Sequence, residues 1–352
     1  YSFSGEYVKD ERLKKMLNFP AVFLGASPYD TPSMYHLMTH VDMNQGVFYP
    51  QGGLNTVIEA IAGLAKKHGV QIHTNSPVTK ILNEGDLAVG VEVGDVRHLA
   101  DVVVASADLH HVETKLLEPK HQTYPSSWWQ KKVPGPSAML LYLGVKGKID
   151  QLDHHTLLYT KDWGKNFFEV FKKADGKSKV PTPASLYICN PSKTDPSVAP
   201  DGYENLFVLV PIAADTVIGK GGIDRSGDAS FEQEADRIID QIASWCEIPD
   251  LKERIVVRRS LGPADFENEF NAWSGTALGM AHTLTQSAFF RPKNYSKKLK
   301  NLFYTGHNTI PGIGLPMCLI GAELVYKHLT ADKSSGPIKN ELNPVSTWKG
   351  LR

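Results

Sequence analysis

The stretch that decides the fold of this chain is Asn301-Leu-Phe-Tyr-Thr-Gly306-His-Asn-Thr-Ile-Pro311-Gly312-Ile-Gly314-Leu-Pro316-Met-Cys-Leu-Ile-Gly321-Ala-Glu323. Its apolar beginning predicts a strand that ends at Gly306, and its last residues predict a helix that continues to about Leu329. The glycines and prolines between them predict a sharp turn. The chain therefore contains a strand–turn–helix unit around residue 310.

The residue types in this turn suit the binding of a flat or electron-rich group. Glycine has no Cβ, so the backbone at Gly312 and Gly314 can approach a ligand closely. Pro316 suits the first turn of a helix, where its missing N–H costs nothing. The start of that helix offers free amide donors and a partial positive charge, which stabilise an anion or an electron-rich carbonyl. The same spacing also fits an ordinary turn whose glycines serve only its geometry.

Residues 46–117 predict α/β structure. A glycine turn ends at Gly53, residues 54–67 form a helix with one apolar face, and Gly69 follows as its C-cap. Residues 70–74, 78–82 and 87–93 read as strands, and residues 98–106 end in a continuous apolar run of the kind found in buried parallel strands. This order of helix, strand, hairpin and strand predicts a mixed sheet.

Residues 118–290 predict a second, mainly antiparallel domain. Loops rich in Pro, Lys and Ser separate the expected strands, and residues 231–246 predict an amphipathic helix. The expected strands are 137–145, 185–189 and 206–211, and two further helices are expected at 6–19 and 33–40. The fold class is thus α/β (mixed α and β) with interleaved domains: residues 1–45 and 118–290 in one, 46–117 and 291–330 in the other, and 331–352 as a tail.

The composition argues against several classes of protein. Among 352 residues, 38 Lys and Arg balance 38 Asp and Glu. Nucleic acid is therefore not expected as a partner, because phosphate binding normally needs a basic excess. The three cysteines, Cys189, Cys246 and Cys318, are far apart, which predicts neither a disulfide framework nor a zinc cage and fits the cytoplasm. No apolar run approaches the roughly 18 residues of a membrane span.

No metal site is expected. His36 and His40 lie four residues apart, but no carboxylate stands at a suitable spacing. The side chains within the pairs His110–His111 and His154–His155 are expected to point to different sides, as loop or surface residues. Cys318 is expected to pack within its helix rather than to take part in redox chemistry.

Several motifs together resemble the phytoene desaturase family, the bacterial and fungal carotenoid desaturases. The segment from Gly306 to Glu323 resembles the flavin-contacting signature of the family, and Gly46-Val-Phe-Tyr-Pro-Gln-Gly-Gly53 resembles its glycine turn before a helix. Further matches in family order are Pro191-Ser-Lys-Thr-Asp-Pro-Ser-Val-Ala-Pro-Asp-Gly202, Leu261-Gly-Pro-Ala-Asp-Phe266, Gly275-Thr-Ala-Leu-Gly279 and Gln286-Ser-Ala-Phe-Phe-Arg-Pro292. Diapophytoene desaturases, carotenoid ketolases and retinol saturases carry similar motifs.

The resemblance implies a Rossmann-like flavoprotein fold and an FAD-dependent oxidoreductase that introduces double bonds into a carotenoid precursor. A flavin is needed because protein side chains cannot accept the two electrons of a desaturation. The helix after the turn would stabilise the pyrimidine end of the reduced flavin. The strand end at residues 105–107 fits a place facing the cofactor as well as a plain strand end, and no catalytic acid or base is assigned. The implied cofactor contacts are Val78, through its backbone, and Gly306, Pro311, Gly312, Gly314, Leu315, Pro316 and Met317.

One family motif is missing from the chain. The family begins with a strand, a GxGxxG turn and a helix that bind the ADP part of FAD. This chain contains no GxGxxG, and it begins with Tyr1 rather than Met. We therefore expect a fragment without the first βαβ unit, in which the pyrophosphate of FAD lacks its main helix N-terminus, so that this chain alone is not expected to bind FAD.

The expected partners are a long polyene, a membrane surface, and quinone or oxygen as electron acceptor. The polyene needs an apolar channel, for which the strands 137–145 and 206–211 and the helix 33–40 are the expected walls. Trp128-Trp129-Gln-Lys-Lys132 places aromatics beside cations, which suits lipid headgroups as well as a solvated loop. We expect a cytoplasmic protein attached peripherally to a membrane. Two alternatives stay open: a flavin-dependent polyene isomerase or saturase, and a non-catalytic chain that only binds a polyene.

Overall fold

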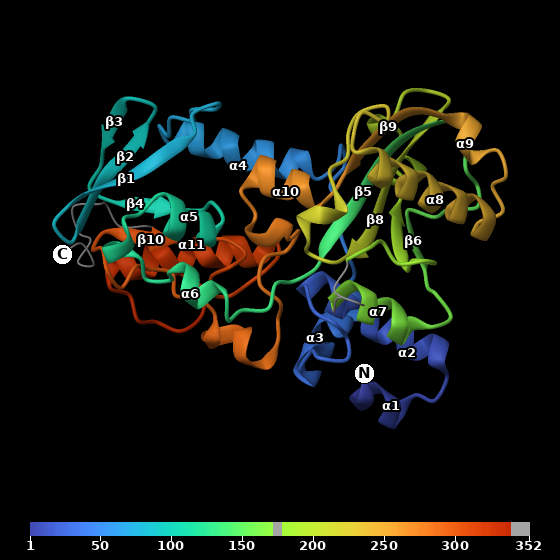
Figure 1. Ribbon diagram of the computed structural model, residues 1–352, viewed down its shortest axis with the longest axis horizontal. Coiled ribbons are helices and arrows are strands. Elements are labelled where there is room, and N and C mark those ends of the chain that lie inside the picture. The colour runs from blue at the N-terminus through green and yellow to red at the C-terminus, as the bar shows by residue number, and fades with distance from the viewer. Residues whose placement is uncertain (172–177, 339–352) are drawn as a thin grey trace. The chain divides into compact units, whose positions relative to one another are not determined.

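The computed structural model describes residues 1–171 and 178–338, which form two compact units that alternate along the chain (Figure 1). Unit 1 contains Tyr1–His73, Pro136–Glu269 and Ser274–Ala277, and unit 2 contains Thr74–Gly135, Phe270–Trp273 and the described residues from Leu278. The mixed α and β fold with interleaved parts is confirmed. The contact boundaries fall at other residues than the predicted domain boundaries, and the assignment of segments to a flavin domain and a substrate domain stays a prediction. Of the predicted tail, residues 339–352 lie outside the described residues.

An antiparallel five-stranded sheet forms the centre of unit 1, in the order β6-β7-β8-β5-β9. Its two long strands pair from Ser137 opposite Ile212 to Lys146 opposite Tyr203 with no register shift. The strands predicted in this region are therefore confirmed. Their bounds are β5 (Ser137–Lys146), β6 (His155–Leu158), β7 (Leu186–Cys189), β8 (Tyr203–Ile212) and β9 (Ile255–Leu261).

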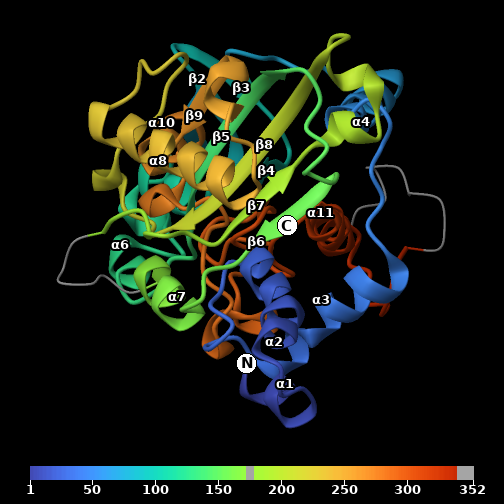
Figure 2. The same cartoon turned by 90° about the vertical axis from the view of Figure 1, so that its right-hand side faces the viewer.

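Helix α8 (Ala229–Trp245) packs against one face of this sheet (Figure 2). Alternate residues of β5 and β8 point toward the helix and are fully buried, as the period of two in a strand requires. Each large apolar side chain buried here stabilises the fold by about 1.5–3 kcal/mol. This core holds Phe231, Ala235, Ile238, Ile239 and Ile242 of the helix, Met139, Leu141, Leu143 and Val145 of β5, and Leu206, Val208, Val210 and Ile212 of β8.

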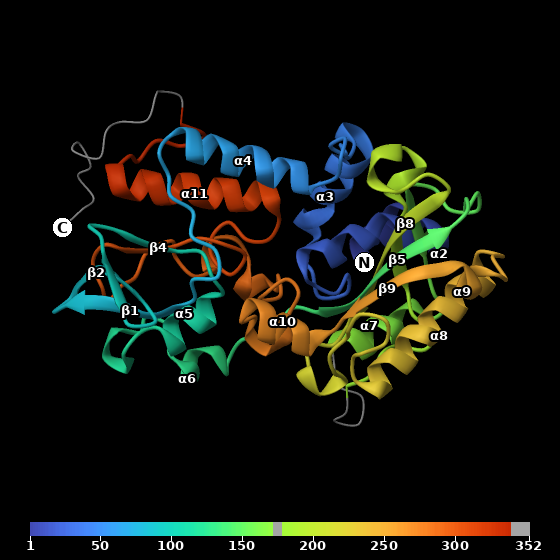
Figure 3. The same cartoon turned by 90° about the horizontal axis from the view of Figure 1, so that it is seen from above.

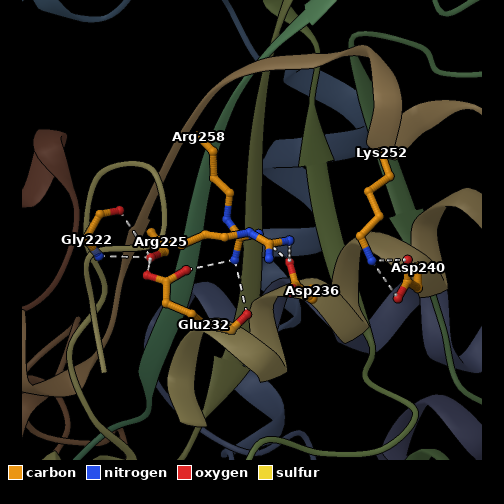
Figure 4. A network of polar contacts seen from close by, with 8 residues as sticks. Gly222, Arg225, Glu232, Asp236, Asp240, Lys252 and Arg258 are labelled. Carbon is orange, nitrogen blue, oxygen red and sulfur yellow. Dashed lines mark hydrogen bonds and ion pairs between the residues drawn. The ribbon is translucent and has the colours of Figure 1, made fainter. Parts of the chain in front are cut away.

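A buried ion-pair network attaches β9 to α8 (Figure 4). The Arg258 guanidinium donates to Glu232 Oε2 at 2.7 Å and also to Asp236. Ser260 Oγ donates to Glu232 Oε1 at 2.5 Å. These contacts compensate the burial of the charges, because an unpaired charge in an apolar core is very costly.

Near its N-terminus, unit 1 contains two short helices where the sequence predicts a single one. The helix predicted at 6–19 is interrupted, since Asp10 leaves helical geometry and its side chain accepts a hydrogen bond from Arg12 N at 2.8 Å, capping the second helix. The prediction at 33–40 is met by a 3₁₀ turn followed by a short α-helix. The bounds are α1 (Ser2–Tyr7), α2 (Glu11–Asn18), α3 (His36–His40), α4 (Asn55–Lys67), α7 (Trp163–Phe171), α9 (Leu251–Arg254) and α10 (Pro263–Phe270).

Helix α4 and the segment after it keep their apolar side chains in solvent. The helix forms as predicted, yet Val57, Ile58, Ile61 and Leu64 on its apolar face are exposed. The strand predicted at 70–74 is wrong for this structure. A strand requires a neighbour for its backbone hydrogen bonds, and none of the described strands pairs with these residues.

Unit 2 contains two small sheets (Figure 3). Its first sheet is antiparallel, with β1 (Val78–Glu84), β2 (Leu87–Val93) and β3 (Val96–Leu99). In the second, β4 (Val103–Ala105) pairs in parallel with β10 (Leu302–Tyr304), which confirms the predicted parallel strand but shortens it. The helices are α5 (Leu109–Lys115), α6 (Ser126–Trp129) and α11 (Leu315–Thr330). A core that includes Ile81, Val103, Leu109, Trp129 and Tyr304 joins these elements. Among the described helices, none has the length and apolarity to cross a bilayer.

Candidate functional site

The predicted glycine turn lies in unit 2 between β10 and α11. Thr305 N donates to Ala105 O at 3.1 Å, so the turn leaves from the end of the parallel strand pair. Gly306, Gly312 and Gly314 have φ values of 113°, 136° and 113°, a region that other residues rarely adopt. Gly314 is the N-cap of α11, Pro316 lies in its first turn, and no side chain of the described residues caps it. The turn therefore presents an uncapped helix start.

Two of these glycines differ in the space around them. A Cβ on Gly312 would lie 2.7 Å from Nε2 of the buried His282. At Gly314 the nearest atoms of the described chain, on Pro316 and Met317, are 4.0 Å from a Cβ position. Packing thus requires glycine at 312, whereas Gly314 is exposed, so that a ligand can approach its backbone.

A buried arginine fixes the middle of the turn. Arg291 donates to the carbonyl oxygens of Thr309 at 3.3 Å, of Gln286 at 3.1 Å and of His307. Hydrogen bonds from a charged donor are stronger than those between neutral groups. The carbonyls of His307 and Thr309 are held in one arrangement as a result.

Asn294 and Thr309 hold the two ends of the turn together. Asn294 Nδ2 donates to Tyr304 O at 3.2 Å and to Ile310 O at 2.9 Å. Thr309 Oγ1 donates to Gly306 O at 2.9 Å. Because all these groups are buried or half-buried, losing one partner would leave polar atoms unsatisfied.

Asn308 and Asp108 connect the turn to the first residues of α5. Asn308 Nδ2 donates to Asp108 Oδ2 at 3.0 Å, and Asn308 Oδ1 accepts from Met280 N at 2.9 Å. Asp108 also caps α5 by accepting from His110 N at 2.9 Å. His307 Nε2 lies 3.4 Å from Asp108 Oδ2 but outside hydrogen-bond geometry.

A buried carboxyl supports the strand before the turn. Tyr304 Oη donates to Glu113 Oε1 at 2.6 Å, and Tyr124 N donates to Glu113 Oε2 at 2.9 Å. Burial raises the pKa of Glu113, and the same cause, reinforced by Glu113, raises the pKa of Tyr304. The tyrosine consequently stays a neutral donor.

The structure brings most of the predicted site residues together. Gly306, Pro311, Gly312, Gly314, Leu315, Pro316 and Met317 form one continuous turn and helix start. Val78 is elsewhere, at the beginning of β1, where it packs half-buried against the core that holds Leu302 and Tyr304. Cys318 is half-buried, and burial raises the pKa of its thiol, in keeping with a packing role.

Unit 1 offers an apolar surface on the face of its sheet opposite α8. Tyr142 and Phe207 are cross-strand partners on β5 and β8 with ring centroids 5.3 Å apart. Tyr187 of β7 lies 6.4 Å from Phe207 and 6.5 Å from Phe23. These rings are partly exposed and form a continuous aromatic row. A separate cavity of about 530 Å³ in unit 1 is lined by Tyr159, Pro183 and Trp245 together with charged groups such as Asp162, Lys165 and Glu169.

Comparison with known proteins places these features in a family. A family model described as "Flavin containing amine oxidoreductase" matches residues 3–324. The chain is 40% identical over 329 residues to the "Carotenoid 3,4-desaturase" of Haloarcula japonica, covering 93% of this chain and 63% of that protein. It is 35% identical over 335 residues to the "zeta-carotene-forming phytoene desaturase" of Myxococcus xanthus, covering 94% of this chain and 61% of that protein.

A solved structure shares the fold. An oxidoreductase from Methanosarcina mazei superposes with a TM-score of 0.60 at 17% identity, covering 91% of this chain and 65% of that one. At such identity the likeness concerns the fold alone. The chain spans about three fifths of the length of the two curated relatives, at 63% and 61%.

Proposed function

The chain belongs to the flavin-containing amine oxidoreductase family, and we propose that it is part of an FAD-dependent oxidoreductase that introduces double bonds into a carotenoid precursor. The observation that carries this proposal is the locked glycine turn 306–314 ahead of the uncapped helix α11. The two curated relatives are named for carotenoid desaturation. Family membership identifies FAD as the cofactor.

The turn has the properties that the ring system of a flavin requires. The exposed backbone at Gly314 would let a flat group approach, and the first amides of α11 would then face its electron-rich side. Arg291 and Asn308 would keep this cradle rigid, so that no reorganisation is needed when charge develops. Gly306, Pro311, Gly312, Gly314, Leu315, Pro316 and Met317 would hold the flavin, with the backbone of Val78 as a further contact.

The aromatic row on the sheet of unit 1 is the proposed polyene surface. A hydrocarbon chain gains free energy by leaving water for an apolar face, at about 25 cal/mol per Å². Tyr142, Phe207 and Tyr187 supply flat apolar area, and Arg259 borders it as the cross-strand partner of Tyr142 on β9. A bound flavin would supply the two-electron acceptor that the conversion of a –CH2–CH2– unit to a C=C bond requires, and the accompanying proton would pass to solvent. Quinone or oxygen would then take up the two electrons.

A membrane surface is the proposed source of so apolar a substrate. Trp129 is buried at 1% exposure, so it belongs to the core rather than to a lipid contact. Lys132 lies over the ring of Trp128 at 4.3 Å, and Gln286 joins the neighbouring segment by accepting from Val133 N at 2.9 Å. That segment exposes Leu284, Phe289 and Phe290. Exposed aromatics beside lysines suit a headgroup layer, which favours peripheral attachment of a cytoplasmic protein.

The test joins this chain to the part of the Haloarcula japonica relative that it does not cover. The purified protein should be yellow with flavin bands, and it should bleach without oxygen when phytoene in liposomes is added. A colourless, folded protein would refute the role of the turn at 306–317 and favour a polyene-binding chain without catalysis. A yellow protein that rearranges or saturates the polyene without net electron transfer to an acceptor would establish the isomerase or saturase alternative.

A further inference from the structure

Two histidines and a cysteine meet at one edge of the five-stranded sheet of unit 1. His155 of β6 is the cross-strand partner of Cys189 of β7. The rings of His154 and His155 have centroids 4.4 Å apart, and nitrogen and sulfur donors of all three residues lie within 4.8 Å of one another. The prediction that the two histidines point to different sides is wrong, because His154 precedes β6 and the alternation of a strand does not include it.

Neighbouring side chains hold both imidazole rings through their Nδ1 atoms. His154 Nδ1 lies 2.6 Å from Thr194 Oγ1, and His155 Nδ1 lies 2.8 Å from Tyr187 Oη. In both rings these contacts leave Nε2 as the available donor atom. Nε2 of His154 is buried and has no hydrogen-bond partner among the described residues. A hydrogen bond to the other ring nitrogen is the usual way in which a protein orients a metal-binding histidine.

We propose that His154, His155 and Cys189 bind a divalent cation of the zinc class. One thiolate and two imidazoles form a donor set that Zn²⁺ prefers, with a water completing four ligands. Bonds of about 2.3 Å to sulfur and 2.0–2.1 Å to nitrogen place tetrahedral ligands roughly 3.3–3.7 Å apart, so donors that are now within 4.8 Å must close up by at most about 1.5 Å. His155 is exposed and can rotate to do so. The cation replaces the thiol proton, which passes to solvent.

The site would connect three segments of unit 1. His155 and Cys189 belong to the edge strand and its neighbour, and His154 packs against Tyr49 with ring centroids 4.8 Å apart. Asp195, in the loop that also contains Thr194, accepts from Gly52 N at 2.6 Å. A bound cation would therefore stabilise the edge of the sheet together with the glycine turn at 46–53. This inference does not depend on the proposed flavin chemistry.

Zn²⁺ and Co²⁺ binding to the metal-free chain tests the site. Competition with a chromophoric chelator should give one Zn²⁺ per chain, and Zn²⁺ should raise the melting temperature. Co²⁺ should give the visible bands of a four-coordinate ion and a thiolate charge-transfer band. His155→Ala should weaken Zn²⁺ binding by at least about tenfold, and Cys189→Ser should abolish the charge-transfer band.

The controls separate this site from adventitious binding. Cys246→Ser removes another half-buried free thiol, and His36→Ala removes a histidine outside the cluster. Both variants should bind Zn²⁺ like the parent chain. Because His155 is exposed, its alanine variant should keep the melting temperature of the metal-free parent. Failure of the parent to bind Zn²⁺, or Zn²⁺ binding by His155→Ala and Cys189→Ser that is as tight as in the parent, would overturn the proposal.

Discussion

Asn308 donates through Nδ2 to Asp108 Oδ2 at 3.0 Å, which links residues 200 positions apart in the sequence. The same asparagine accepts from Met280 N, and the same aspartate caps α5. One buried amide thus fastens the glycine turn to two other segments of unit 2. Both side chains are almost fully buried, so each hydrogen bond is shielded from competing water.

Asn308→Ala should destabilise unit 2. The change leaves Met280 N and one oxygen of Asp108 without partners, which costs about 1–3 kcal/mol for each buried group. Urea unfolding followed by fluorescence should show a lower midpoint than the parent, and the extended protein should hold flavin less tightly. Asn205→Ala, which removes a half-buried asparagine of unit 1, is the matched control for flavin affinity. An unchanged midpoint for Asn308→Ala would show that this link does not stabilise the turn.

Gly312→Ala should damage the turn more than its single added methyl suggests. The new Cβ would lie 2.7 Å from His282 Nε2, and φ of 136° is unfavourable for alanine. Strain of about 1–3 kcal/mol corresponds to a loss of roughly 5- to 150-fold in flavin affinity if the turn binds flavin. Fluorescence titration with FAD on the extended protein measures this loss.

Gly63→Ala provides the comparison for that experiment. Gly63 lies in α4, and a Cβ there meets no atom of the described chain within 4 Å. Alanine should favour the helix by about 0.5–1 kcal/mol and leave FAD affinity unchanged. Equal affinities for Gly312→Ala and Gly63→Ala would mean that the turn at 312 does not shape the flavin site.

Sequence periodicity predicts most helices and strands correctly, but it does not predict which other elements pack against them or pair with them. The alternation in β5 and β8 and the apolar face of α8 predict elements that the structure confirms, because each buries its apolar side within unit 1. Helix α4 shows the same kind of pattern, yet its apolar face is exposed. Residues 70–74 do not form the predicted strand, since pairing depends on a neighbour that their own pattern does not specify.

The sequence predicts the glycine turn of the candidate site, but it does not indicate the side chains that hold the turn in place. Glycine and proline at 306–316 act locally through their own conformational preferences, so the turn is readable from sequence. Asn308, Asp108 and Asn294 act through contacts between distant segments, and nothing in their spacing indicates them. Arg291 belongs to the family motif from Gln286 to Pro292, but its role depends on carbonyls of the turn that the motif does not contain. The His154–Cys189 contact likewise arises from strand pairing.

Glu113→Gln should change how stability depends on pH. Burial raises the pKa of Glu113, so the folded protein holds this proton more tightly than the unfolded chain, where the pKa is about 4.3. The resulting stabilisation is complete below that value and is lost as the pH rises through the folded pKa. The parent should therefore lose stability toward neutral pH relative to the glutamine variant, whose amide can still bond Tyr124 N and Tyr304 Oη.

Urea midpoints between pH 4 and pH 8 measure this difference. Glu267→Gln, at an exposed position of α10, is the control and should follow the parent at every pH. Parallel curves for Glu113→Gln and the parent would mean that Glu113 titrates alike in the folded and unfolded chains.

Arg258→Ala should be the most destabilising of these changes for unit 1 (Figure 4). It leaves Glu232 buried without its 2.7 Å partner and removes the contact to Asp236. Breaking a buried ion pair from one side costs about 3–5 kcal/mol. Lys252→Ala breaks a pair with Asp240 whose side chains are 43% and 59% exposed, and should cost less than about 1 kcal/mol.

The double variant Glu232→Leu/Arg258→Met should recover much of the loss, because apolar groups of similar size replace the pair without leaving a charge. If Arg258→Ala and Lys252→Ala had the same unfolding midpoint, the buried network would contribute no more than a surface ion pair.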